Sequence, residues 1–281
     1  MTDVQTRGGV VSCRERGIGL PVVLLPAAGH TGSDYDAVVP GLSRRYHRTI
    51  AVDWPGHGAS PAPEPGAATA SGFADAAEDV VEALAPEGAV VIGNSVGGFA
   101  AARLAMRRPD LVRALVLVNA GGFVARTPKV RVACAALGRP SVLRRVYPRF
   151  AANYMRAARE EDRRVLRDTV EGMRDPVRVQ TVASVWRSFT RDESDLRADV
   201  RGITAPTLVV WGARDPNIPV AAGRALAAAL PDGRMLELDC GHVPFASAPE
   251  AFGGALHLFL AQALGEDRPV APPRAINVVR L

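Results

Sequence analysis

The chain has 281 residues, 48% of them hydrophobic, which is enough apolar material for the core of a large globular domain. No segment approaches the roughly 18 uninterrupted apolar residues of a membrane-spanning helix, so we expect no membrane partner. The polar start, Met1–Gly9, lacks the apolar run of a signal peptide, and we therefore expect a cytoplasmic protein.

Charge and cysteine content exclude further classes. The 34 basic residues slightly outnumber the 29 acidic ones, and Lys129 is the only lysine, so the arginine excess indicates a composition bias rather than a nucleic-acid-binding protein. Cys13, Cys134 and Cys240 are odd in number and widely spaced, which favours reduced thiols over a disulfide framework or a zinc site. We expect no bound metal and no cofactor.

Short apolar, β-branched runs alternate with helical stretches along most of the chain. The expected strands are Val10–Cys13, Pro21–Leu25, Thr49–Asp53, Gly88–Ile92, Ala114–Val118, Thr207–Trp211 and Met235–Leu238. The expected helices are Tyr35–Arg45, Ser71–Ala85, Ser95–Arg108, Val220–Leu230 and Pro249–Leu264. This alternation predicts an α/β fold with a mostly parallel sheet between two layers of helices, in which the first one or two strands are free to run antiparallel. The proline-rich tail, Asp267–Leu281, is expected to be irregular.

The alternation stops near Ala125 and resumes near Ala205. Helical patterns occupy the interval at Leu143–Tyr154, Glu160–Met173 and Val177–Phe189. We therefore predict a core domain formed by residues 1–124 and 204–281, with a helical cap, or lid, formed by residues 125–203. The cap holds 18 basic and 10 acidic side chains. Solvated helix faces explain this charge, and attraction of anionic substrates is the alternative.

The sequence GNSVGG at residues 93–98 follows an apolar strand and opens an alanine-rich helix. That context is the one in which the pattern G-x-S-x-G forms a nucleophile elbow, with the serine on a strained turn. Ser95 would occupy the apex, and a Cβ at Gly93 or Gly97 would collide where the strand and the helix cross. The backbone N–H of Val96 would face an oxyanion.

Together with three further motifs, this elbow resembles the α/β-hydrolase superfamily over nearly the whole chain. The other motifs are DWPGHGAS at 53–60, WGARDP at 211–216 and CGHVP at 240–244. The resemblance implies the α/β-hydrolase fold, with a helical cap inserted after the sixth core strand. It also implies a catalytic triad in the chain order Ser95, Asp215, His242.

The chemistry needs each member of this triad. A serine hydroxyl requires an imidazole to take its proton, and a carboxylate must hold that imidazole in the correct tautomer. His242 alone among the five histidines follows both Ser95 and the acid on a loop after a strand, whereas the others fall in a turn, a helix or a position before a strand: His30, His47, His57 and His257. The alternative family position for the acid holds Asn119, and Asp239 is the rival carboxylate.

The sequence PAAGH at residues 26–30 stands where the family commonly has His-Gly-x. Alignment of the strand ends makes the backbone N–H of Ala28 the second oxyanion donor beside Val96. We expect His30 to be solvated in this loop, with a place in the pocket wall as the alternative. Trp186 and Phe189 are expected to pack between cap helices, with the pocket as the alternative.

A serine at the apex excludes relatives that use an aspartate nucleophile, namely haloalkane dehalogenases and epoxide hydrolases. We therefore expect a serine hydrolase that cleaves an ester, thioester or lactone of a small to medium organic molecule through an acyl-enzyme, with the cap choosing the substrate. One alternative is a C–C bond hydrolase of a vinylogous 1,5-diketone, because its elbow also reads Gly-Asn-Ser. Others are a lyase, a cofactor-free oxygenase or a ligand-binding protein on the same scaffold. The sequence is also compatible with a homo-oligomer.

Overall fold

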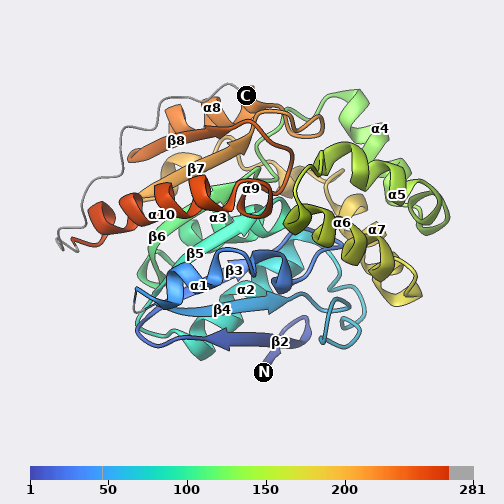
Figure 1. Cartoon of the computed structure of the whole chain (residues 1–281). Coiled ribbons are helices and arrows are strands. Elements are labelled where there is room, and N and C mark those ends of the chain that lie inside the picture. Colours follow the sequence, from blue (N-terminus) through green and yellow to red (C-terminus); the bar gives the residue numbers. More distant parts are fainter. Residues whose placement is uncertain (46, 266–281) are drawn as a thin grey trace.

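The computed structural model describes residues 1–45 and 47–265, and the expected irregular tail lies outside this part of the chain. Eight strands form one sheet (Figure 1). They are β1 (Thr2–Thr6), β2 (Gly9–Arg16), β3 (Leu20–Leu25), β4 (His47–Asp53), β5 (Ala89–Asn94), β6 (Val112–Val118), β7 (Thr207–Gly212) and β8 (Gly233–Leu238).

The strand order is β1-β2-β4-β3-β5-β6-β7-β8. The pairs β1–β2 and β2–β4 are antiparallel, and every other pair is parallel. The prediction of a mostly parallel sheet with an antiparallel start is confirmed. Because parallel strands end at the same edge, the residues that follow β3, β5, β6, β7 and β8 converge there.

Helices cover both faces of the sheet, which explains why its central strands are apolar throughout. On β3, Val23 and Leu25 join the core under α2, α3 and α8, whereas Val22 and Leu24 face the core under α1, α9 and α10. The bounds of these helices are α1 (Val39–Ser43), α2 (Ala70–Leu84), α3 (Val96–Arg107), α8 (Val220–Ala229), α9 (Pro244–Ser247) and α10 (Pro249–Ala263).

Four helices between β6 and β7 gather at one end of the sheet, toward which the arrowheads of β4 and β5 point (Figure 1). They are α4 (Pro128–Leu137), α5 (Pro140–Met155), α6 (Glu160–Gly172) and α7 (Pro176–Ser188). We refer to residues 125–203, which contain these four helices and their connections, as the cap. No helix in the described ranges is both long and apolar enough to cross a membrane.

Several elements differ from the prediction. The helix expected near Tyr35–Arg45 is confirmed only over the short α1, which has Pro40 in its first turn, because the preceding residues form a 3-10 turn at Gly32–Tyr35. β1 was not predicted because its residues are mostly polar, and it is held as an edge strand by pairing with β2. α4 and α9 were also not predicted, and each begins at a proline.

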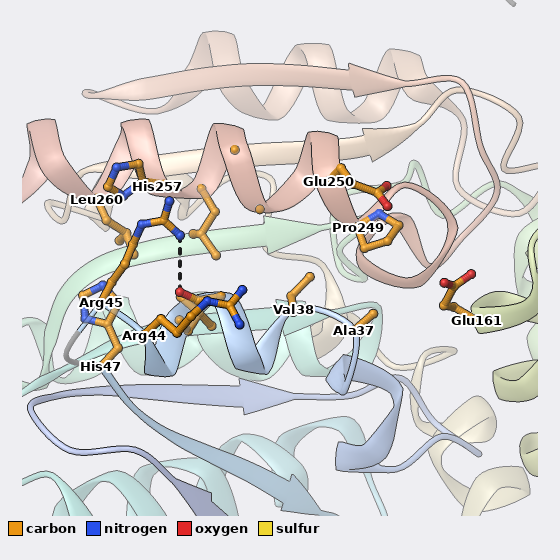
Figure 2. Close-up of a pocket in the computed structure, with 15 residues that line it drawn as sticks. Ala37, Val38, Arg44, Arg45, His47, Glu161, Pro249, Glu250, His257 and Leu260 are labelled. Atoms are coloured by element: carbon orange, nitrogen blue, oxygen red, sulfur yellow. Dashed lines mark hydrogen bonds between the residues drawn. The ribbon is translucent and has the colours of Figure 1, made fainter. Parts of the chain in front are cut away.

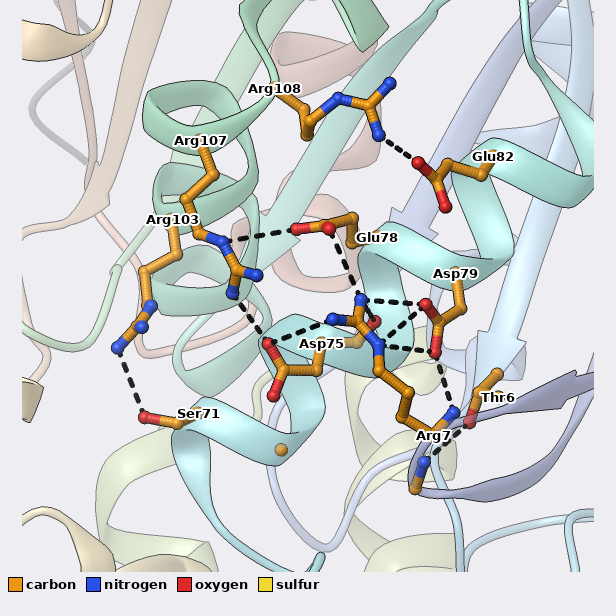
Figure 3. A network of polar contacts seen from close by, with 12 residues as sticks. Thr6, Arg7, Ser71, Asp75, Glu78, Asp79, Glu82, Arg103, Arg107 and Arg108 are labelled. Atoms are coloured by element: carbon orange, nitrogen blue, oxygen red, sulfur yellow. Dashed lines mark hydrogen bonds and ion pairs between the residues drawn. The ribbon is translucent and has the colours of Figure 1, made fainter.

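A network of polar contacts ties the turn between β1 and β2 to α2 and α3 (Figure 3). Arg7 contacts Asp75, Glu78 and Asp79 on α2, and Arg107 on α3 contacts Asp75 and Glu78 as well. Single surface ion pairs contribute ~0–1 kcal/mol, so the network holds the edge strand in register more than it stabilises the core.

The crossing of β5, α3 and β3 is the tightest constraint near the expected nucleophile. A Cβ on Gly93 would collide with the carbonyl oxygen of Gly97, and a Cβ on Gly97 with that of Leu25. Both collisions are with backbone, which cannot move aside without shifting the strand or the helix. The prediction for these two glycines is confirmed.

The substitution Gly97→Ala should therefore destabilise the protein by at least about 2 kcal/mol, because the methyl group forces α3 away from β3. Gly254→Ala on α10 is the matched control, since its added methyl meets nothing within 4 Å and alanine favours a helix by about 0.5–1 kcal/mol. Denaturant unfolding of both variants measures the difference. Equal stability of the two would contradict the crossing argument.

Candidate active site

Ser95 joins β5 to α3 with a backbone that L-residues rarely adopt, φ 56° and ψ −115°. Its N–H donates to the carbonyl of Val118 on the neighbouring strand at 3.0 Å. Its own carbonyl accepts from the N–H groups of Phe99 at 3.0 Å and Gly121 at 2.8 Å. These bonds maintain a strained turn that lifts the hydroxyl out of the sheet edge.

His242 and Asp215 form a buried pair at the same edge. His242 Nδ1 lies 2.6 Å from Asp215 Oδ2, and each residue is 5% exposed. Burial raises the pKa of the Asp215 carboxyl, but the charge and hydrogen bond of His242 and the backbone N–H groups of Asn217 and Ile218 outweigh it, so the pKa is lowered overall. The carboxyl is thus kept ionised beside the imidazole.

Asn119 supports this carboxylate. Its Nδ2 donates to Asp215 Oδ2 at 2.7 Å, and its Oδ1 accepts from the N–H of Gly212 at 2.9 Å. The residue is fully buried with φ 40°. The sequence indicated Asn119 only as the alternative position for the acid, and its contact with Asp215 follows from the pairing of β6 with β7. Asp239, the rival acid, instead pairs with Arg214 on the surface.

Asn94, the middle residue of Gly-Asn-Ser, does not line the cavities beside Ser95. Its Nδ2 donates to the carbonyls of Val118 and His242, both at 3.0 Å, and its side chain is fully buried. The amide therefore links β5, β6 and the loop that carries His242. Sequence reasoning did not identify this role, which depends on two residues far away in the chain.

The loop after β3 presents Ala28 beside Ser95. The N–H of Gly29 donates to His57 Nε2 at 2.9 Å, and the N–H of His30 donates to the carbonyl of Ala27 at 3.2 Å. The N–H groups of Gly29 and His30 are thus already hydrogen-bonded within the protein, which favours the N–H of Ala28 as the donor available to a ligand. Among the hydrogen bonds of the described chain, none engages the Ala28 N–H.

The imidazole of His57 anchors this loop by accepting the hydrogen bond from Gly29. Burial and the charge of Arg178 lower its pKa to about 3, so the imidazole is neutral. Nδ1 donates to the carbonyl of Pro55 at 3.1 Å, which leaves Nε2 free to accept from Gly29. The turn that contains His57 therefore orients the loop that carries Ala28.

His30 is 1% exposed, so its expected solvation is wrong. It bridges Asp34, with 2.5 Å between Nδ1 and Oδ2, and Tyr154 of α5, with 2.7 Å between Nε2 and Oη. The chain bends back in the 3-10 turn at Gly32–Tyr35 and places Asp34 beside the ring. The contact between His30 and Asp34 therefore depends on this 3-10 turn, which the sequence did not predict.

The cap is hydrogen-bonded to both loops that bear expected catalytic groups. The Tyr154 carbonyl accepts from the His242 N–H at 3.0 Å, and the two rings meet edge to face with centroids 5.1 Å apart. Tyr147 Oη lies 2.8 Å from Thr169 Oγ1, which donates to the carbonyl of Gly29 at 2.8 Å. These contacts fix the cap over the sheet edge.

Two cavities adjoin Ser95 and share Ala28, Trp186, Asn217 and Ile218 in their walls. The smaller, of about 40 Å³, is the tyrosine pocket, whose wall also holds Tyr147, Tyr154 and His242. The larger, of about 120 Å³, is the arginine pocket, whose wall also holds Val96, Arg126, Cys134 and Phe189. Trp186 and Phe189 thus line the site, as the alternative prediction allowed.

A separate cavity of about 480 Å³ lies between α1 and α10 and shares no lining residue with these pockets. Figure 2 shows its two ends, with Arg44, Arg45, His47 and His257 at one and Glu161 and Glu250 at the other. His47 and His257 therefore line this separate cavity rather than either pocket beside Ser95. In the described part of the chain, no group of three or more His, Cys, Asp or Glu side chains is arranged to hold a metal ion.

Comparison with known proteins identifies a family model and relatives that match most of the chain. A family model described as "Alpha/beta hydrolase family" matches residues 22–255. A pimeloyl-[acyl-carrier protein] methyl ester esterase of Chromobacterium violaceum is 32% identical over 252 residues, 85% of this chain and 94% of that protein. A 2-hydroxymuconate semialdehyde hydrolase of Pseudomonas putida is 26% identical over 273 residues, 93% of this chain and 94% of that protein.

Among solved structures, the enol-lactonase from Burkholderia xenovorans LB400 superposes with a TM-score of 0.80 at 25% sequence identity. The match covers 92% of this chain and all of that one. The predicted fold class is therefore confirmed.

The buried His57 should make the stability depend on pH. The pKa of a histidine in the unfolded chain is about 6.5, whereas the pKa of His57 in the folded protein is about 3. Between these two pH values the unfolded chain therefore binds a proton that the folded chain does not. As the pH falls through this range, the free energy of unfolding decreases by up to about 1.4 kcal/mol per pH unit. His57→Gln cannot titrate, yet it keeps an oxygen for the Gly29 N–H. Urea unfolding at about pH 6 and about pH 5 should show a shallower loss for the variant. Parallel losses would contradict the assigned role of His57.

Proposed function

Because this chain belongs to the alpha/beta hydrolase family and is an enzyme of the hydrolase class, we propose that it cleaves a carboxylic ester, thioester or lactone with Ser95, His242 and Asp215. The observation that carries the proposal is the His242–Asp215 pair, joined at 2.6 Å, with His242 opening onto the same cavity as Ser95 on its strained turn. These observations support acyl transfer from a serine.

In the proposed reaction, His242 Nε2 takes the hydroxyl proton as Ser95 Oγ attacks the substrate carbonyl. The carbonyl oxygen becomes an oxyanion, which the N–H groups of Val96 and Ala28 stabilise. His242 then gives the proton to the leaving oxygen or sulfur, and the acyl-enzyme forms. A water molecule, deprotonated by His242, releases the acid and restores Ser95.

Asp215 contributes by keeping His242 in the tautomer with a proton on Nδ1, and by stabilising the imidazolium that forms during each step. The lowered pKa of Asp215 supports this role, because an ionised carboxylate is needed throughout. Asn119, which is itself held by the N–H of Gly212, and the backbone N–H groups of Asn217 and Ile218 hold the carboxylate in place. They act on the base through Asp215, so they are positioning groups.

We propose in addition that the cap, residues 125–203, selects the substrate. The support is the wall of the two cavities, to which α5 contributes Tyr147 and Tyr154 and α7 contributes Trp186. Substrate groups on either side of the scissile carbonyl would therefore touch cap side chains, whereas the reacting atoms would touch the sheet edge.

A C–C bond hydrolase is the second candidate, favoured by the Gly-Asn-Ser elbow and by the similarity to the 2-hydroxymuconate semialdehyde hydrolase. The elbow carries less weight than the sequence suggested, because the Asn94 side chain is fully buried and its Nδ2 donates to two backbone carbonyls of its own chain. Turnover of a dienoic 1,5-diketone in preference to every ester tested would select this candidate.

An activated phosphonate should label one residue, Ser95, because only a serine next to a general base attacks it at neutral pH. Intact-mass analysis and peptide mapping locate the adduct, and Ser95→Ala should remain unlabelled and lose ester turnover while staying folded. An adduct elsewhere in the folded wild type would overturn the assignment of the nucleophile.

Replacing Asp215 by asparagine should lower kcat by roughly four orders of magnitude, because His242 then loses the partner that selects its tautomer. Asp239→Asn is the matched control: it removes the same charge from the neighbouring strand end, and its carboxylate contacts Arg214 rather than His242. Steady-state kinetics on one activated ester compares the two. A larger loss for Asp239→Asn would reverse the assignment of the acid.

A further inference from the structure

Arg126 is placed unusually for an arginine of the cap. It lies between β6 and α4, its side chain is 13% exposed, and it lines the arginine pocket together with Ser95. Most of the pocket wall is apolar, including Val124, Val130 and Phe189. Among the described residues of that wall, Arg126 is the only charged side chain, since burial raises the pKa of the Cys134 thiol to about 11.

The guanidinium is incompletely satisfied. Nη1 pairs with Asp192 and Nη2 donates to the carbonyl of Thr190, but the buried Nε has no hydrogen-bond partner. A buried donor without an acceptor is destabilising, and more so when it is charged. An anionic group in the pocket would offset the cost of burying this cation.

The charge of Arg126 is also only weakly neutralised. Asp192 is 96% exposed, so water screens its pairing with Arg126. Asp195, whose carboxyl pKa the charge of Arg126 helps to lower, is bound by Arg197 at 2.8 Å. A mostly buried cation beside an apolar wall therefore retains a positive field that an anion can meet.

The two pockets take different halves of the substrate. His242 must protonate the leaving group, and it lines the tyrosine pocket rather than the arginine pocket. The alcohol or thiol therefore leaves on the tyrosine side. The acyl chain, whose carbonyl oxygen meets the Val96 N–H, extends into the arginine pocket, where Val96 and Arg126 are both part of the wall.

We propose that Arg126 binds a carboxylate at the far end of the acyl group, so that the enzyme acts on half-esters or lactones of dicarboxylic acids. This inference rests on the proposed function of Ser95 and adds the substrate class to it. Arg126 is a specificity-determining residue, because it touches the substrate away from the reacting atoms and provides a charge-assisted contact.

The test compares 4-nitrophenyl half-esters of succinate, glutarate and adipate with the same compounds capped as methyl esters at the far end. Wild-type kcat/KM should be higher for the free carboxylate of at least one chain length. Arg126→Gln should lower kcat/KM for that substrate roughly 10- to 100-fold and for its capped analogue less than about 3-fold. Arg126→Lys, which keeps the charge, should restore part of the loss.

Arg131→Gln is the matched control, because Arg131 is an exposed residue of α4 and its loss removes one cap charge outside the pocket wall. It should leave both substrate classes unchanged. Equal losses for the two arginine variants would show a long-range effect of cap charge and overturn the inference. Equal losses for free and capped substrates in Arg126→Gln would also overturn it, as would a wild type without preference.

Inhibition of the wild type supplies a test that does not depend on a variant that folds. Glutarate or adipate should compete with a neutral ester, and the corresponding diamide should compete at least tenfold more weakly. Equal inhibition by acid and diamide would contradict a carboxylate subsite. Ser95→Ala separates the two proposals: turnover that survives this substitution refutes the proposed function, whereas Ser95-dependent turnover without a carboxylate preference refutes only the role of Arg126.

Discussion

The rest of the site depends on one steric constraint, the close crossing of β3, β5 and α3 at the elbow. Backbone atoms approach so closely at Gly93 and Gly97 that a methyl group fits at neither position. The approach forces Ser95 into a strained conformation, and its carbonyl is held by Phe99 and Gly121. It also brings the start of α3, with the Val96 N–H, beside the loop after β3. Backbone contacts thus position the hydroxyl and the Val96 N–H, whereas the loop of Ala28 also depends on the side chain of His57.

A second layer of polar contacts connects the cap to this edge. Tyr154 reaches His242 through its carbonyl and His30 through its hydroxyl, and Thr169 reaches the carbonyl of Gly29. Because these groups are buried, breaking them leaves polar atoms without partners, so the cap cannot lift freely without disturbing the loops of Ala28 and His242.

The net positive charge of the cap has at least two distinct origins. Several cap arginines, among them Arg164, Arg167 and Arg174, pair with exposed carboxylates of α6 and serve solvation. Arg126 differs because it is mostly buried in the wall of a cavity and has an unpartnered Nε. Burial therefore distinguishes Arg126 from these surface arginines, although each of them adds one positive charge to the cap.

The sequence by itself determined the parts of the protein that depend on local pattern. Alternating apolar runs predicted the parallel sheet, and the glycines around Ser95 predicted the tight crossing, because both are properties of neighbouring residues. It also indicated Asp215 and His242, since their motifs follow strands whose ends must meet. The tertiary structure alone decided what depends on distant residues in contact: the support of Asp215 by Asn119, the anchoring of the Gly29 loop by His57, the burial of His30 and the place of Arg126 in a pocket wall. These contacts join segments up to 124 residues apart, and side-chain burial over such separations follows from packing rather than from any local pattern.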